Sequence, residues 1–239
     1  MTRHMSNQLA TYELRDGIGI VTLDDGKANA ISLAMQASLN SALDQAESDD
    51  VPVVLTGRDG IFSAGFDLKT IAAGGQDTVD MLNGGINLAI RLLEFPRPVV
   101  AASGGHAIAM GVFFLLSCDF RIGVRGTHRY TANEVAIGMA MPLSTIEILR
   151  QRVSPAALSR AVLLAEVFGS HNAVENGLLD SVVEPELLME TALATAATFA
   201  SLDRAAHLHS KRRLRGPVVD AIRDGLARDN EAWRAQFLR

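Results

Sequence analysis

Phe62-Ser-Ala-Gly-Phe-Asp-Leu-Lys69 is the most informative segment of this 239-residue chain for its fold class. It follows the short apolar segment 51–55 and the turn-forming Gly57-Arg-Asp-Gly60, and it leads into a short helical run. A tight glycine turn at the start of a helix leaves backbone N–H groups without acceptors, and such groups can bind an anion. The segment therefore predicts a strand that turns into a helix with outward-pointing donors.

A second junction of this kind is Gly104-Gly-His-Ala-Ile-Ala-Met-Gly-Val-Phe-Phe114. Here the buried strand predicted at 99–102 passes through a glycine turn into the apolar segment 108–116, so a second outward N–H donor is expected near Met110. A third feature is Ala132-Asn-Glu-Val-Ala-Ile-Gly138, where Glu134 stands alone in an apolar stretch. Each feature alone also has a structural explanation, because strand–glycine–helix turns are common and a lone Glu is more often solvated than catalytic.

The rest of the chain alternates strand and helix patterns and then becomes helical. Asp16-Gly17 joins two predicted strands as a hairpin turn, and Ser32 is the expected N-cap of an amphipathic helix. This order indicates an α/β fold with a helical C-terminal region. Strands are predicted at 9–14, 17–23, 51–55, 99–102 and 120–124, and helices at 32–48, 77–93, 144–152, 155–168, 171–177, 186–201, 204–214 and 217–229.

Composition excludes several classes of protein. The net charge of −5 gives no general attraction for nucleic acid or an anionic membrane. Cys118 is the only cysteine, and the six histidines lack metal-ligand spacing, so neither an intramolecular disulfide nor a metal site is predicted. The segment 108–116 is too short to span a bilayer, and the polar N-terminus lacks the apolar core of a signal peptide. These features predict a cytoplasmic protein.

The three features and their order resemble the crotonase (enoyl-CoA hydratase/isomerase) family from Leu9 to the final helix. Leu23-Asp-Asp-Gly-Lys-Ala-Asn-Ala-Ile-Ser32 is similar to the family's early loop, which meets CoA, and residues 62–69 are similar to its signature. The resemblance implies a ClpP-like spiral core of stacked ββα turns over 1–185. It also implies a C-terminal helical region, 186–239, that packs homotrimers or dimers of trimers. The implied substrate is a CoA thioester, with no permanently bound cofactor.

The resemblance also implies the roles of individual residues. The backbone N–H groups of Phe66 and Met110 would form an oxyanion hole, in which each donor contributes about 3 kcal/mol, and Glu134 would be the catalytic acid–base. The residues expected to contact substrate are Lys27, Ala28, Ala64, Gly65, Asp67, Leu68, Phe113, Met139 and Lys211. Lys69 is a further candidate for the CoA phosphates, and Ile71, Met81, Met139 and Met141 are candidates for the walls around the acyl chain.

Two positions depart from the family pattern. Met110 replaces the middle residue of a triple glycine, and its N–H keeps its place if its backbone is helical. Phe113 stands where hydratases of the family carry their first catalytic Glu. Adding water across a double bond requires two polar groups, whereas one base can move a double bond by carrying a proton from C2 to C4. The remaining pair, Asn133-Glu134, looks like the corresponding stretch of Δ3,Δ2-enoyl-CoA isomerases.

The prediction is therefore an isomerase that converts 3-enoyl-CoA to 2-enoyl-CoA. The apolar neighbours Val135, Ala136 and Ile137 are expected to raise the pKa of Glu134 towards neutrality. Two alternatives remain open at this point. The chain could be a hydratase, or catalyse another reaction of the family, with Glu134 as its sole carboxylate, or it could be a catalytically silent acyl-CoA-binding protein. The sequence does not specify acyl chain length, substituents or pathway.

Overall fold

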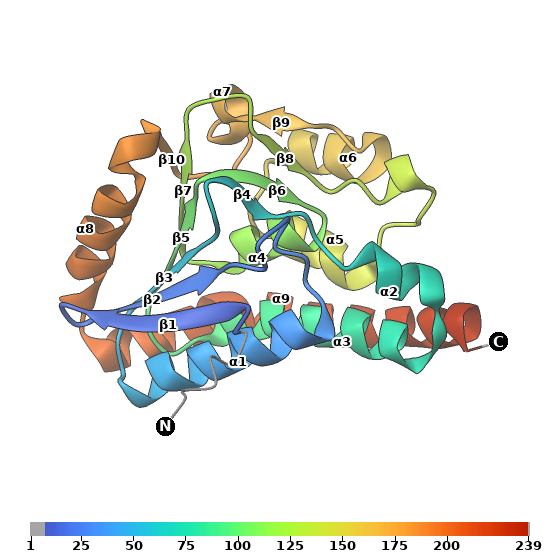
Figure 1. Ribbon diagram of the computed structural model, residues 1–239, viewed down its shortest axis with the longest axis horizontal. Coiled ribbons are helices and arrows are strands. Elements are labelled where there is room, and N and C mark those ends of the chain that lie inside the picture. Colours follow the sequence, from blue (N-terminus) through green and yellow to red (C-terminus); the bar gives the residue numbers. More distant parts are fainter. Residues whose placement is uncertain (1–7, 239) are drawn as a thin grey trace.

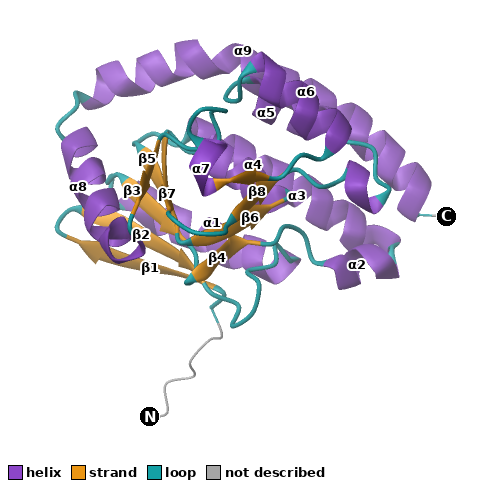
Figure 2. Cartoon of the chain, turned by 90° about the horizontal axis from the view of Figure 1, so that it is seen from above, coloured by secondary structure: helices purple, strands orange, loops and turns teal. Residues whose placement is uncertain are grey.

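Two β-sheets form the centre of the molecule (Figures 1 and 2). The computed structural model describes residues 8–238, so the polar N-terminal segment 1–7 used in the sequence analysis lies outside the described residues. The larger sheet has six strands in the order β1-β2-β3-β5-β7-β10, and only the β1–β2 pair is antiparallel. Its strands are β1 Ala10–Arg15, β2 Ile18–Leu23, β3 Val53–Thr56, β5 Val99–Ser103, β7 Phe120–Val124 and β10 Ser181–Val183.

The smaller sheet determines where the three sequence features meet. Its order is β4-β6-β8-β9, in which β4, β6 and β8 are parallel and β9 is antiparallel to β8. The carboxyl ends of parallel neighbours lie at the same edge of a sheet, so the segments that follow β4, β6 and β8 leave from one edge. Those segments carry Phe66, Met110 and Glu134. The strands are β4 Gly60–Ser63, β6 Gly105–Ile108, β8 Arg129–Thr131 and β9 Phe168–Gly169.

Helices cover the sheets on several sides. In Figure 1, α1, α3 and α9 run below the sheets, and α8 packs against the larger sheet at the left. Ser32 caps α1 as predicted, because its side chain accepts a hydrogen bond from Met35 N. The helices are α1 Leu33–Ser48, α2 Leu68–Ala73, α3 Gly75–Glu94, α4 Met110–Ser117, α5 Leu143–Arg150, α6 Pro155–Leu164, α7 Ser170–Ala173, α8 Leu188–Ala200 and α9 Arg204–Phe237, with 3-10 turns at Val135–Ile137 and Pro185–Leu187.

Helix α4 lies in the middle of the core, and every one of its residues is buried. Its apolar sequence is buried all round, which is the pattern expected for a helix without a solvent face. Gly111 allows this helix to approach β4 closely, because a methyl group there would lie 2.9 Å from Cβ of Ser63 and would overlap its carbonyl oxygen. The buried helix thus fixes the backbone at Met110 against the segment that leads to Phe66.

The C-terminal helix corrects one prediction. Helices were expected at 204–214 and 217–229, with Pro217 near the start of the second, but α9 is continuous and Pro217 lies inside it. Proline removes one N–H, which leaves the carbonyl of Arg213 without its helical partner. Arg213 and Pro217 are both exposed, so water can satisfy that carbonyl. Arg215 and Val219, which flank Pro217, are both buried on the inner face of α9. The helix therefore packs against the core both before and after the proline.

The α/β class and the helical C-terminal region are confirmed, and the short strands are the main omission. Strands β6, β8, β9 and β10 were not predicted, and β4 was predicted without bounds, because runs of two to four residues carry too little periodicity to identify. The helices predicted at 155–168 and 171–177 end earlier, at Leu164 and Ala173. The division of the chain at residue 185 stays a prediction.

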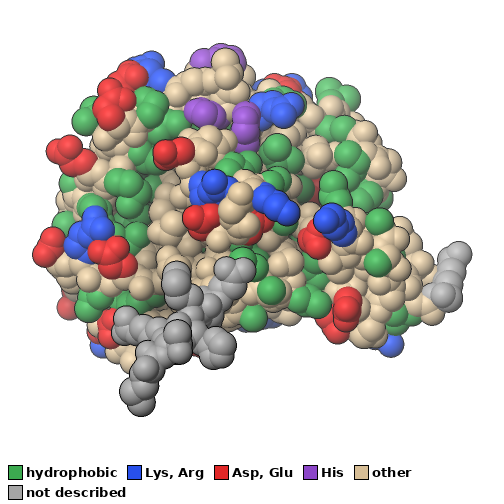
Figure 3. Space-filling model, in the orientation of Figure 1, with side chains coloured by type: hydrophobic (Ala, Val, Ile, Leu, Met, Phe, Trp, Pro, Cys, Tyr) green, Lys and Arg blue, Asp and Glu red, His purple; other side chains and the backbone are tan. Residues whose placement is uncertain are grey.

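Surface and hydropathy add two observations. Within residues 8–238 there is no helix whose length and apolar character together would let it cross a bilayer. Figure 3 shows basic and acidic side chains interspersed over one face of the molecule rather than gathered into separate fields.

Candidate active site

The loop that carries Phe66 lies directly against the start of α4. Gly65 has φ of +89°, and a methyl group there would lie 2.8 Å from Cβ of Ala109 and 3.1 Å from the backbone N of Met110. Only glycine fits this left-handed conformation and this close approach without strain. The segments bearing the two proposed oxyanion donors, Phe66 and Met110, are therefore in contact.

The altered glycine run leaves Met110 at the start of a helix. The positive φ falls on Ala109, at +48°, and Met110 is the first residue of α4. An N–H in the first turn of a helix has no acceptor within that helix. The condition stated for Met110, a helical backbone, is met, and the cost of the departure from glycine falls on Ala109 instead.

Asp67 has a structural role that the sequence analysis did not assign. Its carboxylate caps α2, accepting hydrogen bonds from Lys69 N at 3.1 Å and Thr70 Oγ1 at 3.0 Å. These bonds orient the turn between Phe66 and Leu68. Any contact of Asp67 with substrate would have to come from its backbone or from an oxygen already used in capping.

The early loop is tied to the same turn by Asn29. This buried residue has φ of +52°, and its Nδ2 donates to the carbonyl oxygens of Leu23 at 2.9 Å and Phe62 at 3.2 Å. Ala64 N donates to Ala28 O at 2.9 Å. These bonds place Ala28 beside the Phe66 loop, and the neighbouring Lys27 is exposed.

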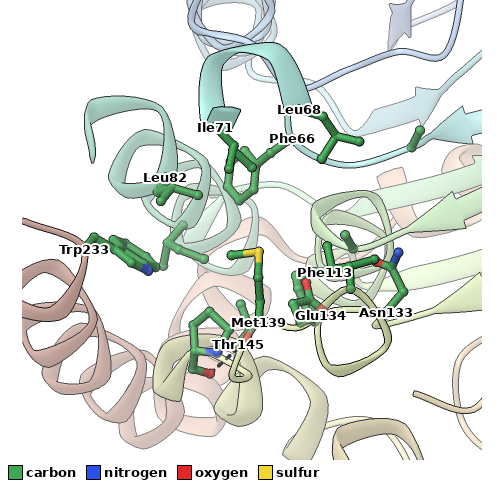
Figure 4. Close-up of a pocket in the computed structure, with 15 residues that line it drawn as sticks. Phe66, Leu68, Ile71, Leu82, Phe113, Asn133, Glu134, Met139, Thr145 and Trp233 are labelled. Carbon is green, nitrogen blue, oxygen red and sulfur yellow. Dashed lines mark hydrogen bonds between the residues drawn. The ribbon is translucent and has the colours of Figure 1, made fainter. Parts of the chain in front are cut away.

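An apolar pocket opens beside these loops (Figure 4). It encloses about 700 Å³, part of it open solvent, and Phe113 on α4 forms one wall while being almost fully buried. Glu134 is the only acidic residue among the described residues that line it. The lining residues are Ala64, Phe66, Leu68, Ile71, Leu82, Ile86, Ala109, Phe113, Asn133, Glu134, Ile137, Met139, Pro142, Thr145 and Trp233.

Glu134 is buried in this pocket, and its Oε2 has no hydrogen-bond partner. Burial disfavours the charged carboxylate and raises the pKa of Glu134 to about 7. The raised pKa was predicted, but the cause predicted for it was partly wrong. Val135 and Ala136 point to solvent, so the apolar surroundings come from the pocket wall instead, with Ile137 contributing its inner side.

The structure brings most of the predicted site residues together. Six of those named as catalytic or as substrate contacts line the pocket, namely Ala64, Phe66, Leu68, Phe113, Glu134 and Met139, as does the predicted wall residue Ile71. Lys27, Ala28, Gly65 and Asp67 lie on the adjoining loops, and Met110 is the first residue of α4. Met81 and Met141 are not pocket walls. Met81 is fully buried in α3, and Met141 packs against the core.

Lys211 is the clearest departure from the predicted site. It is 6% exposed, and its Nζ lies 2.7 Å from Oδ2 of Asp119. Arg215 binds the other oxygen of the same carboxylate at 2.9 Å. The Lys211 ammonium thus anchors α9 to the core, and Lys211 does not line the pocket that contains Glu134.

Several lining residues were missed by the sequence analysis. Leu82 and Ile86 had been assigned to a helix, but their periodicity did not say which wall they faced. Trp233 lies beyond residue 229, where the last helix was expected to end. Among residues 8–238, no three His, Cys, Asp or Glu side chains come together as a metal site would require.

Known proteins share this sequence pattern and fold. A family model described as enoyl-CoA hydratase/isomerase matches residues 13–237. A probable enoyl-CoA hydratase of Rhizobium meliloti (strain 1021) is 26% identical, covering 98% of this chain and 91% of its own length.

Two solved structures are more similar in sequence. An enoyl-CoA hydratase/isomerase family protein from Pseudomonas syringae is 40% identical with a TM-score of 0.91, covering 93% of this chain and 97% of its own. The apo form of an enoyl-CoA isomerase of Mycobacterium tuberculosis is 41% identical with a TM-score of 0.90, covering 96% and 99%. The chain belongs to the enoyl-CoA hydratase/isomerase family, the crotonase family.

Proposed function

We propose that this acyl-CoA enzyme is an isomerase that shifts the double bond of a 3-enoyl-CoA to the 2-position. The observation that carries the proposal is the pairing of one buried acid, Glu134, with the phenyl ring of Phe113 in an apolar pocket. Moving a double bond requires one group that both removes and returns a proton. Adding water requires a second polar group to hold that water.

The proposed reaction runs in two proton transfers. The carboxylate of Glu134 takes a proton from C2, and the electrons of that C–H bond move towards the thioester carbonyl to give a dienolate. The N–H groups of Phe66 and Met110 donate to the negative oxygen. The carbonyl then reforms, C2 and C3 become doubly bonded, and the electrons of the former C3–C4 double bond take the proton back from Glu134 at C4. No atom is gained or lost, and Glu134 ends as it began.

The pKa of Glu134 suits this role. A group with a pKa of about 7 is present in both protonation states near neutral pH, so neither the removal nor the return of the proton is strongly uphill. The buried ring of Phe113 excludes water from one side of the pocket, which limits competing addition of water.

Hydration is the second candidate, and one observation favours it. Asn133 also lines the pocket, and its buried Oδ1 has no hydrogen-bond partner. That oxygen could accept a hydrogen bond from a water near Glu134, which would supply a second polar group without a second carboxylate. The relative from Rhizobium meliloti carries the name of a hydratase.

The direct test is to supply purified protein with 3-hexenoyl-CoA and with crotonyl-CoA in parallel. The proposal expects a conjugated thioester to accumulate from the first at enzyme rates and little loss of conjugation from the second. Glu134→Gln should abolish the isomerisation, whereas Glu175→Gln, an exposed acid on the surface, should leave it unchanged.

Fast hydration of crotonyl-CoA without isomerisation would establish the second candidate. Tight binding without any turnover would establish a silent acyl-CoA-binding protein. A cytoplasmic location, predicted from the composition, and trimeric assembly, implied by the family resemblance, remain predictions alongside this proposal.

A further inference from the structure

The pocket has an open end and a closed end. Leu68 and Ile137 line it and are 68% and 52% exposed, so solvent reaches the pocket beside them. The opposite end is buried. Leu82 is 3% and Ile86 1% exposed on α3, and Trp233 is 7% exposed on α9.

Figure 4 shows how the reacting group and the closed end are arranged. Glu134 and Asn133 lie on one side of the pocket, Trp233 lies on the other, and Met139 lies between them. A charged CoA moiety must stay in water, so it belongs at the open end. An acyl chain with its C2 at Glu134 would then extend past Met139 towards the indole ring of Trp233.

Trp233 is held firmly in this place by the residues one turn before it. The two carboxylate oxygens of Asp229 accept hydrogen bonds from Leu143 N and Ser144 N, each at 2.9 Å, at the start of α5. Asn230 Oδ1 accepts one from Asn83 Nδ2 of α3 at 2.8 Å. Helix α9 is thus fixed to α3, which carries Leu82 and Ile86, and to α5, which contributes Thr145 to the pocket lining.

Close packing adds to these bonds. Gly225 lets α9 approach α5, because a methyl group there would lie 2.8 Å from Ser144 N. A bulky ring on a helix anchored in this way cannot move aside without breaking several contacts, because protein interiors compress little. The helix therefore holds the backbone of Trp233 in place, and its buried indole ring forms a wall of the pocket.

We infer that Trp233 sets the maximum acyl chain length: the site takes CoA thioesters whose apolar tail ends at the indole, and longer tails do not fit. This inference rests on the proposed function only for the orientation of the thioester beside Phe66 and Met110. It does not depend on whether the reaction is isomerisation or hydration.

The chain contains a single tryptophan, so its fluorescence reports on Trp233 alone. The probes are CoA and the saturated thioesters from acetyl- to dodecanoyl-CoA, which carry no double bond to move. CoA and acetyl-CoA should leave the emission unchanged, and the emission should shift once the chain is long enough to reach the ring.

Calorimetry on the same series should show affinity rising about fourfold per methylene up to that length, and then levelling or falling. An emission that responds equally to CoA and to every thioester would overturn the inference. So would affinity that keeps rising past the length at which the emission shifts.

Variants give an independent test. Trp233→Ala should extend the rise in affinity by at least two methylenes, and Trp233→Phe by less. Phe237→Ala is the matched control, because this residue lies one turn further on α9 and packs against the core without lining the pocket. If Trp233→Ala does not fold, the fluorescence series on the wild-type protein still tests whether long acyl chains reach Trp233.

Failures of the two proposals can be told apart. A protein that binds the series with a length limit but turns over no 3-enoyl-CoA would refute the isomerase proposal alone. A protein that isomerises chains of every length with equal kcat/KM would refute the role of Trp233 alone.

Discussion

The phenyl ring of Phe66 lies directly over Gly85 of helix α3. A methyl group on Gly85 would lie 2.5 Å from Cζ of that ring and 3.5 Å from Sδ of Met110. The side chains of both proposed oxyanion residues therefore pack against the same glycine. The ring fills the space beside Gly85 in a closely packed interior, so we expect Gly85 to be a positioning residue for the Phe66 loop and its N–H.

Gly85→Ala should lower kcat about tenfold or more, because the added methyl displaces Phe66 and small misplacements of catalytic groups are costly. Phe66→Ala removes the ring but keeps the amide, so the double variant should recover activity relative to Gly85→Ala. Steady-state kinetics of the three variants complete the cycle. Gly216→Ala, where an added methyl meets open space, is the control and should not affect kcat. Additive losses in the double variant would mean that Gly85 does not act through Phe66.

The raised pKa of Glu134 has consequences for activity. The base form of Glu134 starts the proposed reaction, and burial raises its pKa to about 7. kcat/KM should therefore fall as the pH drops below about 7, following a single ionisation. The pH profile of kcat/KM with 3-hexenoyl-CoA measures this, and a profile flat down to pH 5 would contradict it.

The raised pKa of Glu134 also makes the free energy of unfolding depend on pH. An ion-paired carboxylate, whose pKa is lowered, makes the fold more stable as pH rises, whereas Glu134 makes it less stable. The folded protein holds a proton on Glu134 between the ordinary pKa of 4.5 and about 7, so this group lowers stability as pH rises through that range. Glu134→Gln removes the cost. The variant should match wild type near pH 4.5 and exceed it at pH 8, by on the order of 2–3 kcal/mol. Urea unfolding at both pH values measures the difference, and a gap independent of pH would disprove it.

Ala109 holds a conformation that suits glycine, with φ of +48°. Ala109→Gly should raise the free energy of unfolding by about 1 kcal/mol by removing this strain. Ala107→Gly, in the neighbouring strand β6, should instead lower it by about 0.5–1 kcal/mol. Denaturant unfolding measures the free energy of unfolding of both variants. Destabilisation of similar size in both would show that Ala109 is not strained.

The cluster around Asp119 ties the C-terminal helix to the core. Its carboxylate accepts from Val99 N, Lys211 Nζ and Arg215 Nη2. Asp119→Asn should destabilise the fold by about 3–5 kcal/mol, because it leaves two buried cations without a counter-charge. Asp220→Asn, at an exposed carboxylate near Arg223, should change stability by less than about 0.5 kcal/mol. Thermal unfolding compares the two, and a similar small effect of both would refute the anchoring role.

The residues on short turns were predictable, and those placed by long-range packing were not. Residues 62–69 carry the glycine and the helix start that define the Phe66 turn, so local chemistry was enough. The roles of Lys211 and Trp233 depend on where α9 lies. Pro217 suggested a helix boundary, but α9 continues through it, with Arg215 and Val219 buried on either side of the proline. A sequence pattern does not reveal which buried carboxylate will meet which lysine.

If the buried carboxyl of Glu134 serves both C2 and C4, an isotopic label should be carried from one carbon to the other. 3-Hexenoyl-CoA carrying deuterium at C2 should yield product with a measurable share of that deuterium at C4. The share should exceed what random exchange with solvent allows, because Glu134 is buried, with 8% of the residue exposed. Product formed at enzyme rates with no deuterium at C4 would contradict a single shuttle and point to two separate groups.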